Sequence, residues 1–116
     1  ALAFDAQSSR LYATLSGRNA VAVFDVKASP GAGTPPQLVH AGMIPTGWWP
    51  TDVLVAGPTD PSPGALTVIT GKGHGTGPIG DPLLVGQGGE IGEKMKGSIQ
   101  QIDAPDPAAL SGYTDA

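Results

Sequence analysis

The sequence lacks cysteine entirely, and only 14% of its 116 residues are charged. Without thiols, the chain can form neither disulfides nor thiolate metal sites, although this absence leaves the cellular compartment open. Ten acids outnumber six lysines and arginines, and no basic stripe is present that could neutralise phosphates. We therefore expect no nucleic-acid partner.

Long apolar runs are also absent. The longest is far shorter than the ~20 residues that a membrane-spanning helix needs, so we expect no membrane span. Residues 1–5 lack the basic segment and following apolar segment of a signal peptide. They are typical of the middle of a strand, so we expect a fragment or a processed chain.

Glycine and proline, by contrast, are abundant, with 18 and 12 copies. Both disfavour helix interiors, so the composition argues against long helices. Compact apolar runs at residues 20–24 and 65–69 argue against disorder, because they can build a core.

Short apolar segments alternate with turn residues along most of the chain, which predicts antiparallel strands joined by hairpins. The pattern runs through four strands, restarts at an offset of about 50 residues, and then runs through three more. The expected strands are residues 2–4, 10–15, 20–26, 38–44, 52–56, 65–70 and 97–103.

This repeat predicts an all-β fold made of antiparallel four-stranded β-propeller blades. Residues 1–44 form the expected first blade. Residues 45–116 form a connector and an incomplete second blade, which carries a Gly-rich insertion at residues 71–96 and lacks its fourth strand. Asp106 followed by Pro107 predicts the start of one short C-terminal helix.

Three segments resemble bacterial YVTN-type β-propeller proteins. Residues 44–53 (IPTGWWPTDV) are similar to the inter-blade connector of that family, and residues 10–14 and 19–25 to its second and third strands. Residues 71–78 (GKGHGTGP) and 96–99 (KGSI) resemble a subgroup whose propeller precedes a metal-dependent phosphoesterase domain.

The resemblance implies a part of a larger propeller, placed in the periplasm or outside the cell. A complete propeller of the family has about seven blades, and this chain has fewer than two. The phosphoesterase domain is absent, so the resemblance assigns no catalytic residue here.

Trp48 and Trp49 are the only tryptophans and the first candidate site residues. They could form an aromatic platform for a sugar or another ring. The alternative, which we favour, is that one packs between blades while the other covers the connector, since aromatic side chains dominate core burial.

Lys72 and His74 lie in the Gly-rich segment and could contact an anionic ligand together with backbone N–H groups. The alternative is a solvated loop. Residues 75–80 match G-x-G-x-x-G, but Pro78 removes one N–H and no helix is expected to follow, so we reject a dinucleotide site. The acids that could hold a hard cation are too widely spaced for calcium; they are Asp81, Glu90, Glu93 and Asp103.

From these observations, we expect a structural and interaction module that offers a binding surface, with no catalytic residue, metal or cofactor of its own. The alternative is the propeller portion of a metal-dependent phosphoesterase or lactonase-like hydrolase. Isolated blades would expose apolar faces and an unpaired edge strand. The expected partner is therefore the remainder of a propeller or further copies of the chain, joined through blade faces or edge strands.

Overall fold

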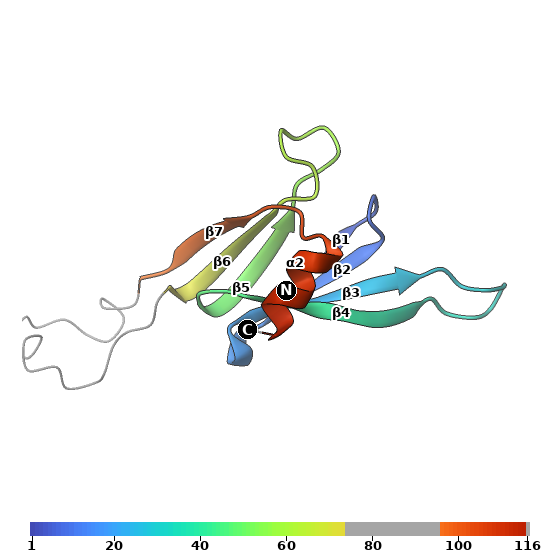
Figure 1. Cartoon of the computed structure of the whole chain (residues 1–116), viewed down its shortest axis with the longest axis horizontal. Coiled ribbons are helices and arrows are strands. Elements are labelled where there is room, and N and C mark those ends of the chain that lie inside the picture. Colours follow the sequence, from blue (N-terminus) through green and yellow to red (C-terminus); the bar gives the residue numbers. More distant parts are fainter. Residues whose placement is uncertain (74–95, 116) are drawn as a thin grey trace, which may run out of the picture.

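The computed structural model describes residues 1–73 and 96–115, which form two antiparallel sheets and one short helix (Figure 1). The first sheet has the order β1-β2-β3-β4 and the second β5-β6-β7. This arrangement confirms the expected all-β class and the C-terminal helix. The strands are β1 (Leu2–Asp5), β2 (Arg10–Leu15), β3 (Ala20–Lys27), β4 (Gln37–Pro45), β5 (Trp48–Val55), β6 (Leu66–Gly73) and β7 (Ser98–Ile102).

Polar turn residues set the hairpins of the first sheet. The Asp5 carboxylate accepts hydrogen bonds from the Gln7 N–H at 3.0 Å and the Ser8 hydroxyl at 2.6 Å, which closes the β1–β2 turn. Between β2 and β3, the chain makes a 3₁₀ turn, η1 (Ser16–Arg18), which ends on Asn19 in the left-handed conformation at φ 51°. Both turns lie where the sequence predicts them.

The first two strands of the second sheet extend further than predicted, β5 at its start and β6 at its end. β5 begins at Trp48 instead of residue 52, because irregularities on either side of Pro50 let the strand keep pairing despite the missing N–H. β6 continues to Gly73, so Lys72 lies on a strand and not in the expected insertion. The rest of that insertion, from His74 to residue 95, lies outside the described residues.

The two sheets pack face to face around one apolar core. Alternate residues of each strand point inward, as the two-residue period of a strand requires. Full burial of one such side chain contributes roughly 1.5–3 kcal/mol. The buried cluster consists of Tyr12, Val21, Val23 and Ile44 from the first sheet, Val53, Leu66 and Val68 from the second, and Leu110 from the helix. Burial raises the pKa of the Tyr12 hydroxyl above its ordinary value, which keeps that group neutral in the core.

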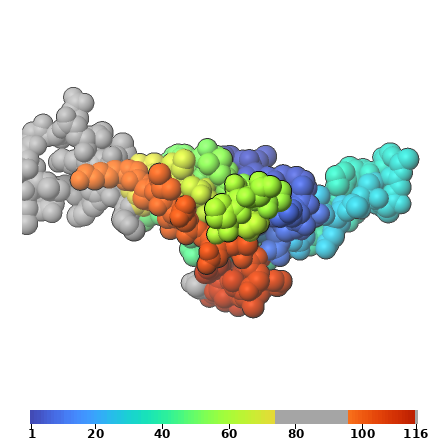
Figure 2. Space-filling view, turned by 90° about the horizontal axis from the view of Figure 1, so that it is seen from above, coloured from blue at the N-terminus to red at the C-terminus, as the bar shows by residue number. Residues whose placement is uncertain are grey.

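The helix α2 (Pro107–Asp115) closes one side of this core. The Asp106 carboxylate caps it by accepting the Ala109 N–H at 2.7 Å, as the sequence predicts. Leu110 inserts into the core, and α2 packs on β4. In Figure 2 the helix forms a lobe beside the sheets, and the distal half of the β3–β4 hairpin extends away from them. Within the described residues, no helix has the length and apolarity needed to cross a membrane.

Candidate binding site at the connector end

The two tryptophans lie where the chain passes from the first sheet to the second. We call this region the connector end; it comprises η1 with Asn19, the start of β5, the end of β6 and the start of β7. The side chain of Trp48 is 51% exposed and that of Trp49 is 48% exposed. Neither tryptophan therefore packs between the two sheets of this chain, in contrast to the expectation that one packs between blades, because side chains from both sheets and from the C-terminal helix fill that space.

Trp49 has an unusual backbone. Its φ of +61° lies in the left-handed region, which is strained for a bulky residue, and it occupies the irregular stretch of β5. The Asn19 side-chain oxygen accepts the Trp49 N–H at 2.9 Å. The Ser16 hydroxyl donates to the Pro50 carbonyl at 2.7 Å. Two hydrogen bonds from η1 and its cap thus hold this part of β5 in place.

Lys72 lies next to Trp49, on the neighbouring strand. Its ammonium nitrogen is 4.7 Å from the centre of the Trp49 ring, within the range of a cation–π contact. The preceding residue is Gly71, and a methyl group there would lie 3.7 Å from Trp49 Cδ1, in van der Waals contact. The structure thus brings together Trp49 and Lys72, two of the four site residues named from the sequence, and Trp48 precedes Trp49 on the same strand. The fourth, His74, lies outside the described residues.

A close-packed polar layer supports the connector below the tryptophans. The Gly47 N–H donates to the Gln100 side-chain oxygen at 2.6 Å, and the hydroxyls of Thr70 and Ser98 lie 2.7 Å apart. A Cβ atom at Gly47 would come within 2.7 Å of the Gly73 carbonyl oxygen, so no larger residue fits without movement. This packing fixes the start of β5 against β6 and β7.

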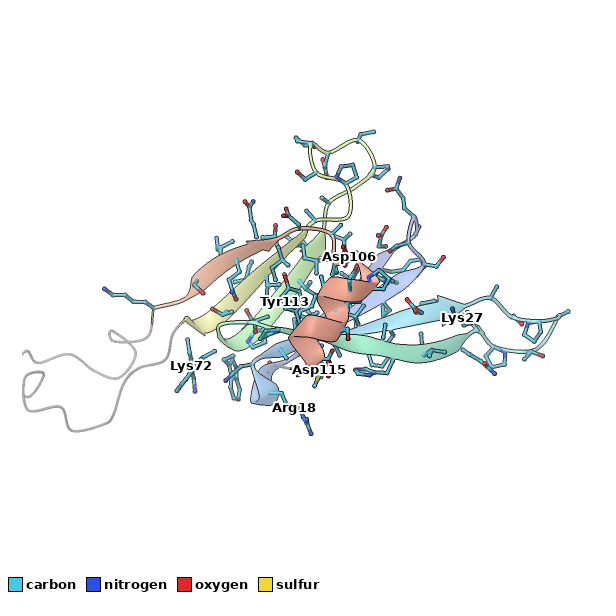
Figure 3. All side chains as sticks on the ribbon, in the orientation of Figure 1. Arg18, Lys27, Lys72, Asp106, Tyr113 and Asp115 are labelled. Atoms are coloured by element: carbon cyan, nitrogen blue, oxygen red, sulfur yellow. The ribbon has the colours of Figure 1, made fainter. Side chains whose placement is uncertain are left out.

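Charges are unevenly distributed between the two ends of the sheets. Arg18, Lys72 and Lys96 lie at the connector end, and Figure 3 shows the first two projecting on the side away from Lys27. Asp52 lies on β5 itself, and Asp115 is the last residue of α2. Most of the acids in the described residues lie towards the opposite end of the sheets; they are Asp5, Asp25, Asp60, Asp103 and Asp106.

A concave region lies at that opposite end, between the β5–β6 loop and the end of β7. It is a pocket of about 270 Å³ that Asp60, Gln101 and Asp103 help to line. The Asp60 carboxylate already accepts the Gly57 N–H at 2.6 Å. Among residues 1–73 and 96–115, no three His, Asp or Glu side chains are grouped to hold a metal ion.

Comparisons of this chain with family models, with curated proteins and with solved structures give no match. The candidate site therefore depends on geometry alone. Sequence reasoning found Trp48, Trp49 and Lys72 from residue type, but it missed Asn19 and Arg18. The only signal for Asn19 was its place in a turn, which does not reveal a hydrogen bond to a residue on another sheet.

Proposed function

We propose that this chain is a structural and interaction module made of one β-propeller blade and an incomplete second blade, which stacks with further sheets of the same kind and offers a binding surface at its connector end. The main support for this proposal is that equivalent faces of the two sheets lie in different surroundings, one in the core and one in solvent.

The two sheets have equivalent cross-strand rows of apolar residues. In the first sheet, Phe4 pairs with Leu11, which pairs with Phe24. In the second sheet, the corresponding row is Val55, Leu66 and Ile102. The neighbouring rows are Leu2–Ala13–Ala22 and Val53–Val68–Gln100, which correspond in position, with the polar Gln100 in the place of Ala22.

These equivalent rows face opposite environments. In the second sheet they point into the core, where Val53, Leu66 and Val68 are buried. In the first sheet they point away from it, and Phe4 and Leu2 are 56% and 69% exposed, whereas the small Ala22 of the same face is only 3% exposed. The outward face of the first sheet thus has the pattern of a surface that packs against another sheet.

The outward face of the second sheet is partly apolar too, with Leu54, Ile69 and Ile99 exposed. By the same equivalence, it corresponds to the inward face of the first sheet. If the packing seen inside the chain is repeated between two copies, the outward face of the first sheet of one copy meets the outward face of the second sheet of the next copy. This head-to-tail contact joins two different surfaces, as in a ring of blades. The resemblance to YVTN-type propellers, and the periplasmic or extracellular location that it implies, belong to the same proposal.

Two single substitutions test the head-to-tail contact in the isolated chain. Phe4→Asp places a charge on the outward first sheet and Ile99→Asp on the outward second sheet. Each variant alone is expected to remain monomeric, because it has lost one of the two surfaces that the contact joins. When the two variants are mixed, the intact face of one can bind the intact face of the other, and we expect a dimer by sedimentation velocity.

Thr59→Asp in the exposed β5–β6 loop adds the same charge away from both faces and serves as the control. A monomeric wild-type chain at high concentration would overturn the proposal. So would association that Phe4→Asp leaves intact, which would indicate pairing at the β7 edge or another surface. Failure of the two variants to combine would show that the contact is not head-to-tail.

A further inference from the structure

The tryptophan pair is exposed although buried aromatic residues are the main source of core stability. Only six of the 116 residues are Phe, Trp or Tyr, and Tyr12 is placed in the core. Trp48 and Trp49, which are neighbours in the sequence, instead expose about half of their surfaces to solvent. Adjacent exposed indoles offer flat apolar area with little loss of side-chain freedom, which suits the recognition of rings.

The backbone of Trp49 gives a second, independent observation. A tryptophan with positive φ is costly, and such strain persists only where the surroundings over-determine it. Here Asn19 and Ser16 reach across from the first sheet to hold Trp49 and Pro50.

Charge then restricts what can bind. The Lys72 ammonium lies over the Trp49 ring, and Arg18 and Lys96 belong to the same end of the molecule. A cationic ligand would be repelled by Lys72. A ligand carboxylate can pair with its ammonium through a charge-assisted hydrogen bond while the ligand ring lies against indole.

We propose that Trp48, Trp49 and Lys72 form a binding site for a small carboxylate ligand that carries a ring able to stack on indole. A uronic acid sugar and an aromatic acid share this chemistry. The tryptophans contact the ring, and Lys72 binds the carboxylate. Asn19 is a positioning residue that acts through the backbone of Trp49.

The chain reports on this site directly, because it has no tryptophan elsewhere. Titrations with glucuronate and with benzoate are followed by tryptophan fluorescence and by the two indole N–H signals in NMR. Glucose and benzamide are the matched neutral probes. We expect a saturable change with an acid, and binding of its neutral partner about tenfold weaker. Whether glucuronate or benzoate binds more tightly separates a sugar site from an aromatic-acid site.

Lys72→Met is expected to abolish the preference for the acid while the folded NMR spectrum is retained. Lys27→Met removes the same charge at the far end of β3 and is expected to bind as the wild type does. Trp48→Phe is expected to weaken binding of acid and neutral probes alike. The proposal is overturned if neither acid gives a saturable change, if acid and neutral probes bind equally, or if Lys72→Met and Lys27→Met behave alike.

Discussion

Trp49 and Asn19 show how two residues in strained conformations can stabilise each other. Both have positive φ, 61° and 51°, and a hydrogen bond joins the side-chain oxygen of Asn19 to the backbone of Trp49. Asparagine tolerates the left-handed region better than most residues, because its short polar side chain forms local hydrogen bonds there. One residue thus ends the 3₁₀ turn of the first sheet and fixes the entry into the second.

Two substitutions of Asn19 separate its backbone role from its hydrogen bond. Asn19→Gly keeps the conformation and loses the bond, so we expect about 0.5–1.5 kcal/mol lower free energy of unfolding. Asn19→Ala also incurs the left-handed penalty, which exceeds the entropy that glycine adds to the unfolded chain. It is expected to be about 1 kcal/mol less stable than the glycine variant. Urea unfolding measures both, and equal stabilities would contradict the role of the left-handed conformation.

Among the elements, the first sheet could be predicted well from the sequence and the start of β5 could not. β2 was predicted residue for residue, because polar turns mark both of its ends. At β5, the proline indicated a connector, since it cannot donate to a ladder. Pairing of Trp48 with Gly73 depends on strand irregularities and on hydrogen bonds from η1, and these are long-range contacts that local patterns do not encode.

The candidate site, like the fold, could be predicted only in part from the sequence. Exposed tryptophans and a nearby lysine attract attention by residue type, yet the sequence favoured burial of one indole. Whether an indole is buried depends on how the core is filled, and the residues that fill it come from five strands and the C-terminal helix. The grouping of three cations at one end also follows from strand order and not from their spacing in sequence.

The helix α2 packs closely against β4 at Gly42. A Cβ atom at Gly42 would lie 2.8 Å from the Thr114 hydroxyl and 3.3 Å from Leu110 Cβ. That hydroxyl also accepts the Met43 N–H at 3.0 Å and donates to the Leu110 carbonyl at 2.7 Å. Moving Thr114 aside therefore costs two hydrogen bonds.

Gly42→Ala is accordingly expected to lower the free energy of unfolding by about 1–3 kcal/mol, as overpacking does elsewhere. Amide hydrogen exchange in α2 should speed up more than exchange in β6, because the clash is local. Gly31→Ala is the matched control, since nothing lies within 4 Å of the added methyl group. If the two variants have the same stability, α2 adapts without cost and its close approach to β4 is not needed.

At the scale of the whole molecule, two features could each drive association. Both sheets turn partly apolar faces outward, and the basic connector end contrasts with the acidic opposite end. The two contacts respond differently to solution conditions. Contact between apolar faces weakens on cooling and strengthens with sulfate, whereas attraction between opposite charges on the surface is screened by salt.

We expect the apolar faces to dominate, because the exposed charges at the ends are single side chains in water. Assembly of the wild-type chain should therefore increase between about 5 °C and about 25 °C, as hydrophobic contacts strengthen with temperature in this range. It should change little between about 0.05 M and about 0.5 M sodium chloride, where surface charge attraction is largely lost. Sedimentation velocity at fixed protein concentration measures both responses, and Phe4→Asp removes the apolar contact while leaving both charged ends in place. A steep loss of assembly with sodium chloride, unaffected by Phe4→Asp, would assign the association to the charged ends and would contradict stacking through the sheet faces.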